Sequence, residues 1–426
     1  MTDRAAELEA AIASAPDDPE PYLVYADWLQ AIDDPRGLLI VLQHHGQAER
    51  ASALIEEHRE HFLGPLAAFA ASGAQGGAAG GAAGGAQAGS SRKLELAWHL
   101  GFIREARIGW GPGARGAARR EAVNALEALL ALPSSRFLRH LAIESAPVEG
   151  SASFGPFLEA LAGAARPPPL RSLFVGQSGA PAAISAVAGV LGAYPELRHL
   201  TLRGSAISLG ELRHAELRAF GIESPLLTPA NLAELRAAAW PRLERLEISF
   251  HARARPVLIR ARDLTPLLGG EGLRSLRHLG VRDCPFADEV VRALADSRLL
   301  PRLSSLDLSG GALSAAGVAA MARARLAFSH LAWLELDRNR LTRAATTLAR
   351  GLAKHVHIGA QEPPVQPQPQ PAAAPVAAAG DAGGGGAGAA GGGAGADGVV
   401  AGVIEVDDEG DADDEDGGDD DADDGE

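Results

Sequence analysis

The chain has 426 residues, of which 46% are apolar and 4% aromatic, and its formal net charge is −15. Its single cysteine, Cys284, excludes an intramolecular disulfide framework. The sequence shows no secretory leader pattern and no uncharged apolar run of about 18 residues, so we expect a cytoplasmic protein without a membrane span.

The negative charge is concentrated at one end of the sequence. Residues 359–426 contain 18 acidic residues and no lysine or arginine, which leaves the rest of the chain at a net charge of +3. This nearly neutral body and the acidic end argue against a nucleic-acid partner, because phosphate backbones would be repelled by the acidic segment.

The first 71 residues predict a small all-α module. Tyr22, Tyr25, Ala26 and Leu29 have the spacing of an amphipathic helix over residues 22–32. Further helices are expected over residues 5–13, 38–45 and 48–69. Residues 72–91 consist mostly of glycine and alanine, so we expect a flexible linker there.

A six-residue unit, Leu-x-x-Leu-x-Leu or a close variant, recurs through residues 92–358. Its eight copies begin at Leu138, Leu170, Leu197, Leu217, Leu243, Leu276, Leu303 and Leu331. Alternating leucines place one apolar side of a short strand inward, and helical segments such as 288–301 lie between copies. A single strand and helix cannot bury that side, so we expect successive units to stack and share one core.

Several strands are followed by a small polar residue or a thiol and then, two positions later, by an apolar residue. The pairs are Ser205 with Ile207, Cys284 with Phe286, and Asn339 with Leu341. Together with the eight copies, this pattern resembles the leucine-rich-repeat family in its longer strand–helix form. The resemblance implies an α/β solenoid of parallel strands with outer helices, in which Cys284 is a buried structural thiol.

The N-terminal module carries a second resemblance. Its motifs are Pro16-Asp17-Asp18, Leu23-Val24-Tyr25-Ala26-Asp27-Trp28-Leu29 and Asp34-Pro35-Arg36-Gly37. They resemble the repeat-companion domain found at the N-terminus of bacterial leucine-rich-repeat proteins, and residues 98–102 resemble the segment that joins that domain to its repeats. We expect Tyr25, Trp28 and Leu29 to be core residues and Asp27 and Arg36 to cap or pair locally. The alternative is a partner-binding face that uses Trp28.

One stretch suggests an enzyme. Gly111, Gly113 and Gly116 lie between a predicted strand over residues 102–108 and a predicted helix over 121–132, which is the outline of a dinucleotide-binding turn. However, Glu144 lies far along the chain for a ribose-binding acid, and Pro112 interrupts the turn. A repeat strand and helix explain the same pattern, so a nucleotide-dependent enzyme is the alternative hypothesis.

The function that we expect is non-catalytic protein binding on the concave face of the solenoid. Residues between the inward leucines of the last three copies should share that face. The candidate partner-binding residues are Trp333, Glu335, Asp337, Asp307, Arg282 and His278. We expect no cofactor and no metal site, and the sequence does not indicate the oligomeric state. Residues 359–426, rich in proline, glycine and aspartate, are expected to be disordered.

Overall fold

The computed structural model describes residues 2–71, 92–110, 116–145, 152–177, 182–250 and 258–362. The expected linker lies outside these residues, as does the expected tail except for residues 359–362. These four residues still contact the body, since the Arg338 amide donates to Ala360 O and the Glu362 amide donates to Asn339 O, both at 2.7 Å. No helix in the described ranges is both long and apolar enough to cross a membrane.

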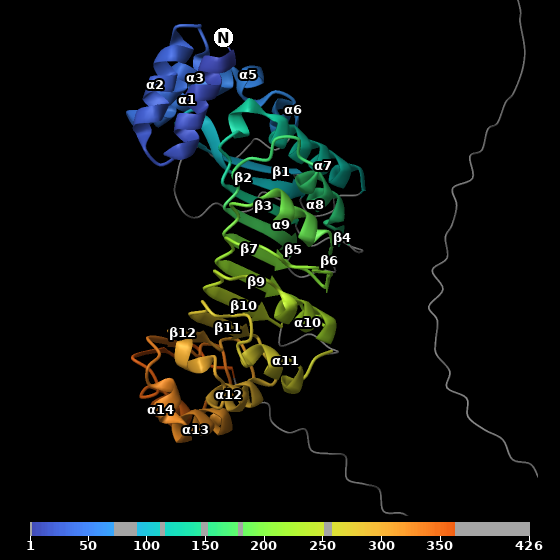
Figure 1. The fold of residues 1–426 in the computed structure, drawn as a ribbon, viewed down its shortest axis with the longest axis vertical. Helices are drawn as coiled ribbons and strands as arrows, with labels where there is room; N and C mark the ends of the chain where they lie inside the picture. The colour runs from blue at the N-terminus through green and yellow to red at the C-terminus, as the bar shows by residue number, and fades with distance from the viewer. Residues whose placement is uncertain are drawn as a thin grey trace, which may run out of the picture. The chain divides into compact units, whose positions relative to one another are not determined.

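A sheet of eleven strands runs through the described part of the chain, with its strands in sequence order (Figure 1). It consists of β1 (Arg92–His99), β2 (Phe102–Trp110), β3 (His140–Ser145), β5 (Ser172–Gln177), β7 (His199–Arg203), β9 (Ala219–Glu223), β10 (Arg245–Ser249), β11 (His278–Arg282), β12 (Ser305–Asp307), β13 (Trp333–Glu335) and β14 (His355–His357). All neighbours from β2 to β14 are parallel. Each predicted copy of the repeat supplies one strand, which begins two residues after its first leucine.

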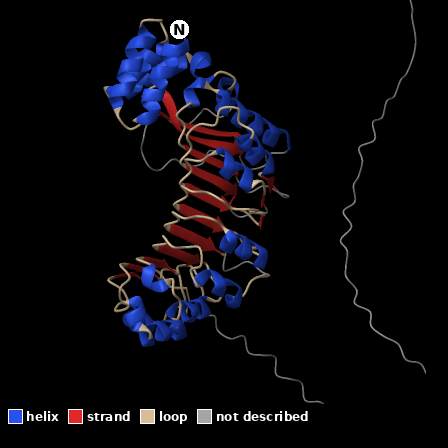
Figure 2. Cartoon of the chain, in the orientation of Figure 1, coloured by secondary structure: helices blue, strands red, loops and turns tan. Residues whose placement is uncertain are grey.

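Helices between the strands gather on one face of this sheet (Figure 2). They are α7 (Gly116–Ala131), α8 (Gly155–Ala162), α9 (Val187–Ala193), α10 (Pro229–Ala237), α11 (Ala261–Leu268), α12 (Ala287–Ala295), α13 (Ala315–Arg323), α14 (Arg325–Phe328) and α15 (Arg343–Ala349). Repeat leucines such as Leu306 and Leu308 are fully buried in one continuous apolar cluster. The repeat-like stacking predicted for the units is therefore confirmed. We call the opposite face of the sheet the open face.

The polar residues Asn339 and Ser205, which follow two of the strands, hydrogen-bond to backbone groups of the turns. The buried Asn339 side chain donates to Leu308 O at 2.8 Å and accepts from the Leu313 amide at 3.1 Å, so it joins two successive units. Ser205 accepts a hydrogen bond from the Ala182 amide at 2.9 Å. Cys284 is a buried free thiol, and burial raises its pKa to about 12, which suits a structural residue and not a nucleophile.

Three very short strands form a second parallel sheet beside the turns of the earlier units. They are β4 (Ala152–Ser153), β6 (Ala182–Ile184) and β8 (Ala206–Ile207). Two 3₁₀ turns, Pro133–Ser135 and Leu300–Arg302, precede β3 and β12. Irregular segments of this kind connect a helix back to the next strand of the stack.

The large sheet extends beyond the eight repeat copies by two strands, β1 and β2, at one end and by one strand, β14, at the other. At the N-terminal end, β1 pairs antiparallel with β2 through a tight turn in which Leu100 and Gly101 have φ values of 44° and 81°. At the other end, β14 pairs parallel with β13. Its sequence keeps the inward pattern with Val356 and Ile358 but lacks the first leucine, which is why the repeat pattern misses this strand.

Six helices precede the sheet, and their bounds correct the expected ones. They are α1 (Thr2–Ser14), α2 (Pro19–Gln30), α3 (Pro35–His44), α4 (Ala48–Glu57), α5 (Arg59–Leu63) and α6 (Leu66–Ala71). The single helix predicted over 48–69 is wrong, because the chain leaves helical geometry at His58 and at Gly64, whose φ is 49°. Helix α2 begins earlier than predicted because the Asp18 carboxylate accepts from the Glu20 amide and caps it.

Core packing of the module follows the prediction, since Tyr25 and Leu29 are buried. Trp28 is half-buried and stacks on Tyr25, with ring centroids 5.7 Å apart. Tyr25 also stacks on Phe102 of β2, with ring centroids 6.1 Å apart. The module and the first strands of the sheet therefore share one apolar cluster.

Arg36 does not pair locally, so that prediction is wrong. It is 5% exposed, and its guanidinium donates to Gly101 O at 2.7 Å and to Ser134 Oγ at 3.0 Å. The same group lies over the rings of Phe62 and Phe102. Gln43 Oε1 accepts from the Gly101 amide at 2.7 Å. Two side chains of helix α3 thus hydrogen-bond to Gly101 in the β1–β2 turn, one to its carbonyl and one to its amide. The sequence motif around Arg36 therefore makes a contact between segments distant in sequence.

Candidate binding surface

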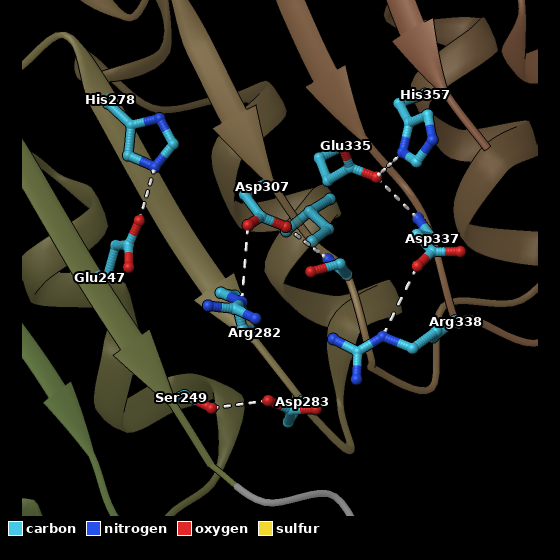
Figure 3. A network of polar contacts seen from close by, with 12 residues as sticks. Glu247, Ser249, His278, Arg282, Asp283, Asp307, Glu335, Asp337, Arg338 and His357 are labelled. Carbon is cyan, nitrogen blue, oxygen red and sulfur yellow. Dashed lines mark hydrogen bonds and ion pairs between the residues drawn. The ribbon is translucent and has the colours of Figure 1, made fainter. Parts of the chain in front are cut away.

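The six candidate residues lie on β11, β12, β13 and the turn after β13. The register aligns His278 with Ser305 and Trp333, and Gly280 with Asp307 and Glu335. Because side chains alternate along a strand, these residues share the open face. We call Trp333, Glu335, Asp337, Asp307, Arg282 and His278 together the binding patch. The structure brings all six of these predicted residues onto one region of the open face. Figure 3 shows five of them, His278, Arg282, Asp307, Glu335 and Asp337.

Trp333 is the large apolar group of the binding patch. It is 56% exposed, although most tryptophans in the chain are buried or half-buried. Its indole stacks on His355 of β14, with ring centroids 4.9 Å apart and an interplanar angle of 30°. The side chain therefore stands on the open face, held from one side, and presents its other side to solvent.

The carboxylates of the binding patch are each held by a neighbouring cation or imidazole (Figure 3). The pairs are Asp307 with Arg282 at 3.6 Å, Glu335 with His357 at 2.6 Å, and Asp337 with Arg338 at 3.6 Å. Backbone amides also point at two of them: Ser309 N donates to Asp307 at 2.8 Å and Asp337 N donates to Glu335 at 3.2 Å. The patch is therefore a pre-organised polar surface around an exposed indole.

Three further residues belong to this surface and were absent from the predicted set. Glu247 of β10 lies 3.4 Å from His278, and His355 and His357 of β14 contact Trp333 and Glu335. Glu247 occupies the same position in its copy as Asp307 and Glu335 do in theirs, so extending the alternation by one copy would have found it. The two histidines were missed because β14 lacks the leading leucine of the repeat.

The Glu247 carboxyl has the largest shift among the acids of this face. Contact with His278 and with Arg245 lowers its pKa from 4.5 to about 2, against the opposing effect of burial. A carboxyl whose pKa is lower in the folded state stabilises the fold above its ordinary pKa. That contribution is lost as the pH falls from about 4.5 to about 2.

We therefore expect Glu247→Gln to destabilise the protein near neutral pH by about 1–2 kcal/mol, a range reduced for partial solvent screening. The difference from wild type should shrink as the pH is lowered through this window, because the wild-type carboxyl becomes neutral too. Urea denaturation at a series of pH values measures this. Equal destabilisation at pH 6 and pH 2 would show that the glutamate acts through packing and not through its charge.

Of the residues in the nucleotide hypothesis, Gly116 and Glu144 lie within the described ranges. Gly111 and Gly113 lie outside them, and Gly116 is the first residue of α7. Glu144, the proposed ribose-binding acid, lies 3.6 Å from Arg107 on the neighbouring strand. No group of three or more His, Cys, Asp or Glu side chains with metal-binding geometry occurs in the described residues. The contacts that the binding patch shows are hydrogen bonds, ion pairs and one aromatic stack.

Comparisons with known proteins bear on the fold alone. No protein-family model matches the chain, and no curated protein matches its sequence. A structural-genomics crystal structure of a protein from Bacteroides fragilis is similar, with a TM-score of 0.51 and 19% sequence identity. The match covers 59% of this chain and 74% of that one. The chain thus shares with this bacterial protein a long, mostly parallel α/β sheet consistent with a repeat solenoid.

Proposed function

We propose that the protein is a non-catalytic binding scaffold of the leucine-rich-repeat type, with an N-terminal repeat-companion module, and that it binds a protein partner on the binding patch. The buried Asn339 that bridges two units supports the repeat type, since an inward Asn after the strand belongs to that pattern. The hydrogen bond from Arg36 to Gly101 O supports the assignment of a repeat-companion module, because it gives the Arg36 motif a role in attaching the module to the sheet.

One observation carries the binding role. Trp333 exposes more than half of its surface on a face where the neighbouring carboxylates are already fixed by partners. Tryptophan buries a large area at little cost in conformational entropy and is enriched among residues that dominate interface energetics. The surrounding carboxylates favour a partner that brings arginine or lysine side chains next to an apolar group.

Replacing Trp333 by alanine should weaken partner capture by about tenfold or more, since loss of an interface anchor typically costs over 1–2 kcal/mol. The measurement is affinity capture from the source organism, quantified by mass spectrometry for wild type and variant side by side. Thermal stability should change little, because the indole is mostly exposed.

Leu326→Ala provides the matched control, because Leu326 on α14 is 92% exposed and lies outside the binding patch. The same partner should be captured equally by this variant and by wild type. If Trp333→Ala retains full capture, the partner binds elsewhere, and the half-buried Trp28 on α2 becomes the next residue to test.

A nucleotide titration of the purified protein tests the alternative enzyme hypothesis independently.

A further inference from the structure

Arginine follows the first leucine in most copies of the repeat. In the stacked strands these arginines come into register with Arg104 of β2, and the successive members are Arg104, Arg139, Arg171, Arg198 and Arg218, which we call the arginine row. The amide of each member donates to the carbonyl of the one before at 2.8–2.9 Å. Neighbouring members are therefore one strand spacing apart, about 4.8 Å, at the edge where the strands begin.

Carboxylates already occupy both ends of the arginine row. At one end Asp17, from the N-terminal module, forms ion pairs with both Arg104 and Arg139, the latter at 3.3 Å. The Arg104 and Arg139 guanidinium groups lower the pKa of Asp17, with the Arg104 hydrogen bond as the largest cause. At the other end Arg218 donates to Glu244 of the next copy at 3.0 Å. A single carboxylate bridging two neighbouring arginines is thus a binding mode that this row already shows.

The middle of the arginine row is open. Within the described residues, neither the Arg171 nor the Arg198 side chain has a hydrogen bond or ion pair, and the Arg171 Nε is buried without an acceptor. Both side chains are half-buried, so their positive charge is only partly hydrated. Like charges on neighbouring units repel each other unless an anion lies between them.

Two neighbouring histidines respond to this positive charge. Burial is the largest cause lowering the pKa of His140 and of His199, both of which lie on the open face beside the row. Arg171 lowers the pKa of His140 further, and Arg198 that of His199. The imidazoles therefore stay neutral near pH 7 and remain available as hydrogen-bond donors to an anion.

We propose that Arg171 and Arg198 form a carboxylate-binding site for an acidic peptide segment of a partner, bound as Asp17 is bound by Arg104 and Arg139. Arg171 and Arg198 immediately precede β5 and β7, apart from the binding patch on β11 to β13. The proposal does not depend on Trp333. An Asp or Glu side chain between the two guanidinium groups gains charge-assisted hydrogen bonds from both.

An acidic peptide fits this edge better than a nucleic acid. Carboxylates such as Glu105 and Glu244 lie along the same edge and would repel a continuous phosphate backbone. Discrete carboxylates can pair with the two open arginines and avoid these acids.

The test measures fluorescence anisotropy of a labelled peptide of alternating glutamate and serine, added to the full-length protein at low ionic strength. Wild type should bind it, and the double variant Arg171→Gln, Arg198→Gln should bind about tenfold or more weakly. The matched control is Arg213→Gln, Arg262→Gln, which removes the same charge from exposed arginines and should bind like wild type. A peptide with glutamine in place of glutamate should not bind.

Two results with the peptide would overturn the proposal: no binding by wild type, or equal weakening by the two double variants. A third would be that an oligothymidylate binds wild type more tightly than the peptide does and that this binding is lost in the Arg171/Arg198 double variant. Circular dichroism melting of each variant verifies folding. If the double variant is unstable, Arg198→Lys replaces it, because lysine keeps the positive charge but lacks the planar guanidinium that can donate two parallel hydrogen bonds to a carboxylate. Its binding should then fall between wild type and no binding, and unchanged affinity would contradict the bridging geometry.

Discussion

Leu306→Ala is expected to destabilise the protein by about 2–5 kcal/mol, the usual range for a buried leucine. Leu306 lies in the middle of β12, is fully buried, and is in register with Leu279 of β11 and Leu334 of β13. The truncation would leave a cavity between two neighbouring units, and the stability of stacked units depends on contacts between nearest neighbours. Urea denaturation followed by circular dichroism measures the loss, and Leu334→Ala should behave similarly.

Asp307→Ala is the control for strand facing, because Asp307 follows Leu306 and points to the open face. It should cost only about 1 kcal/mol, since it removes a hydrogen bond to the Ser309 amide and a partly screened ion pair with Arg282. If the two substitutions destabilised the protein equally, the assignment of inner and outer positions in β12 would be wrong.

Arg36→Ala is expected to cost about 2–4 kcal/mol, because it removes charge-assisted hydrogen bonds and leaves a buried carbonyl without a donor. The guanidinium is the group that ties Gly101 O and Ser134 Oγ to helix α3. Burial lowers the pKa of Arg36, which shows that its charge is held in a poorly solvated place and depends on these partners. Urea denaturation monitored by tryptophan fluorescence measures the effect.

Arg4→Ala serves as the control, since Arg4 makes an exposed ion pair with Glu7 and should contribute little. Gly101→Ala tests the same contact between helix α3 and the β1–β2 turn by changing the residue in the turn. Gly101 has a φ of 81°, and an added Cβ would lie 2.6 Å from Ile40 Cγ1, so the variant should lose about 1–3 kcal/mol through strain and overlap. Small effects from both Arg36→Ala and Gly101→Ala would show that apolar packing alone joins the module to the sheet.

The strands and their facing could be predicted from the sequence because they depend on a local pattern. Alternating leucines expose an apolar side whichever copy they belong to, so every copy, including the one at Leu217, became a parallel strand in the expected place. Asn339 and Cys284 were predictable for the same reason, as each follows its strand at a fixed offset. The shared face of Trp333, Glu335 and Asp307 followed from alternation and stacking together.

Contacts between residues distant in sequence were decided only by the tertiary structure. Arg36 meets a carbonyl 65 residues away, and no local pattern indicates that a buried guanidinium would bind a hairpin turn. The stacking of Trp333 on His355 required β14, a strand too degenerate for the repeat pattern to reveal. The open pair Arg171 and Arg198 also depended on the fold: each arginine is visible in the sequence, but only register and the positions of Asp17 and Glu244 determine which of them have a partner.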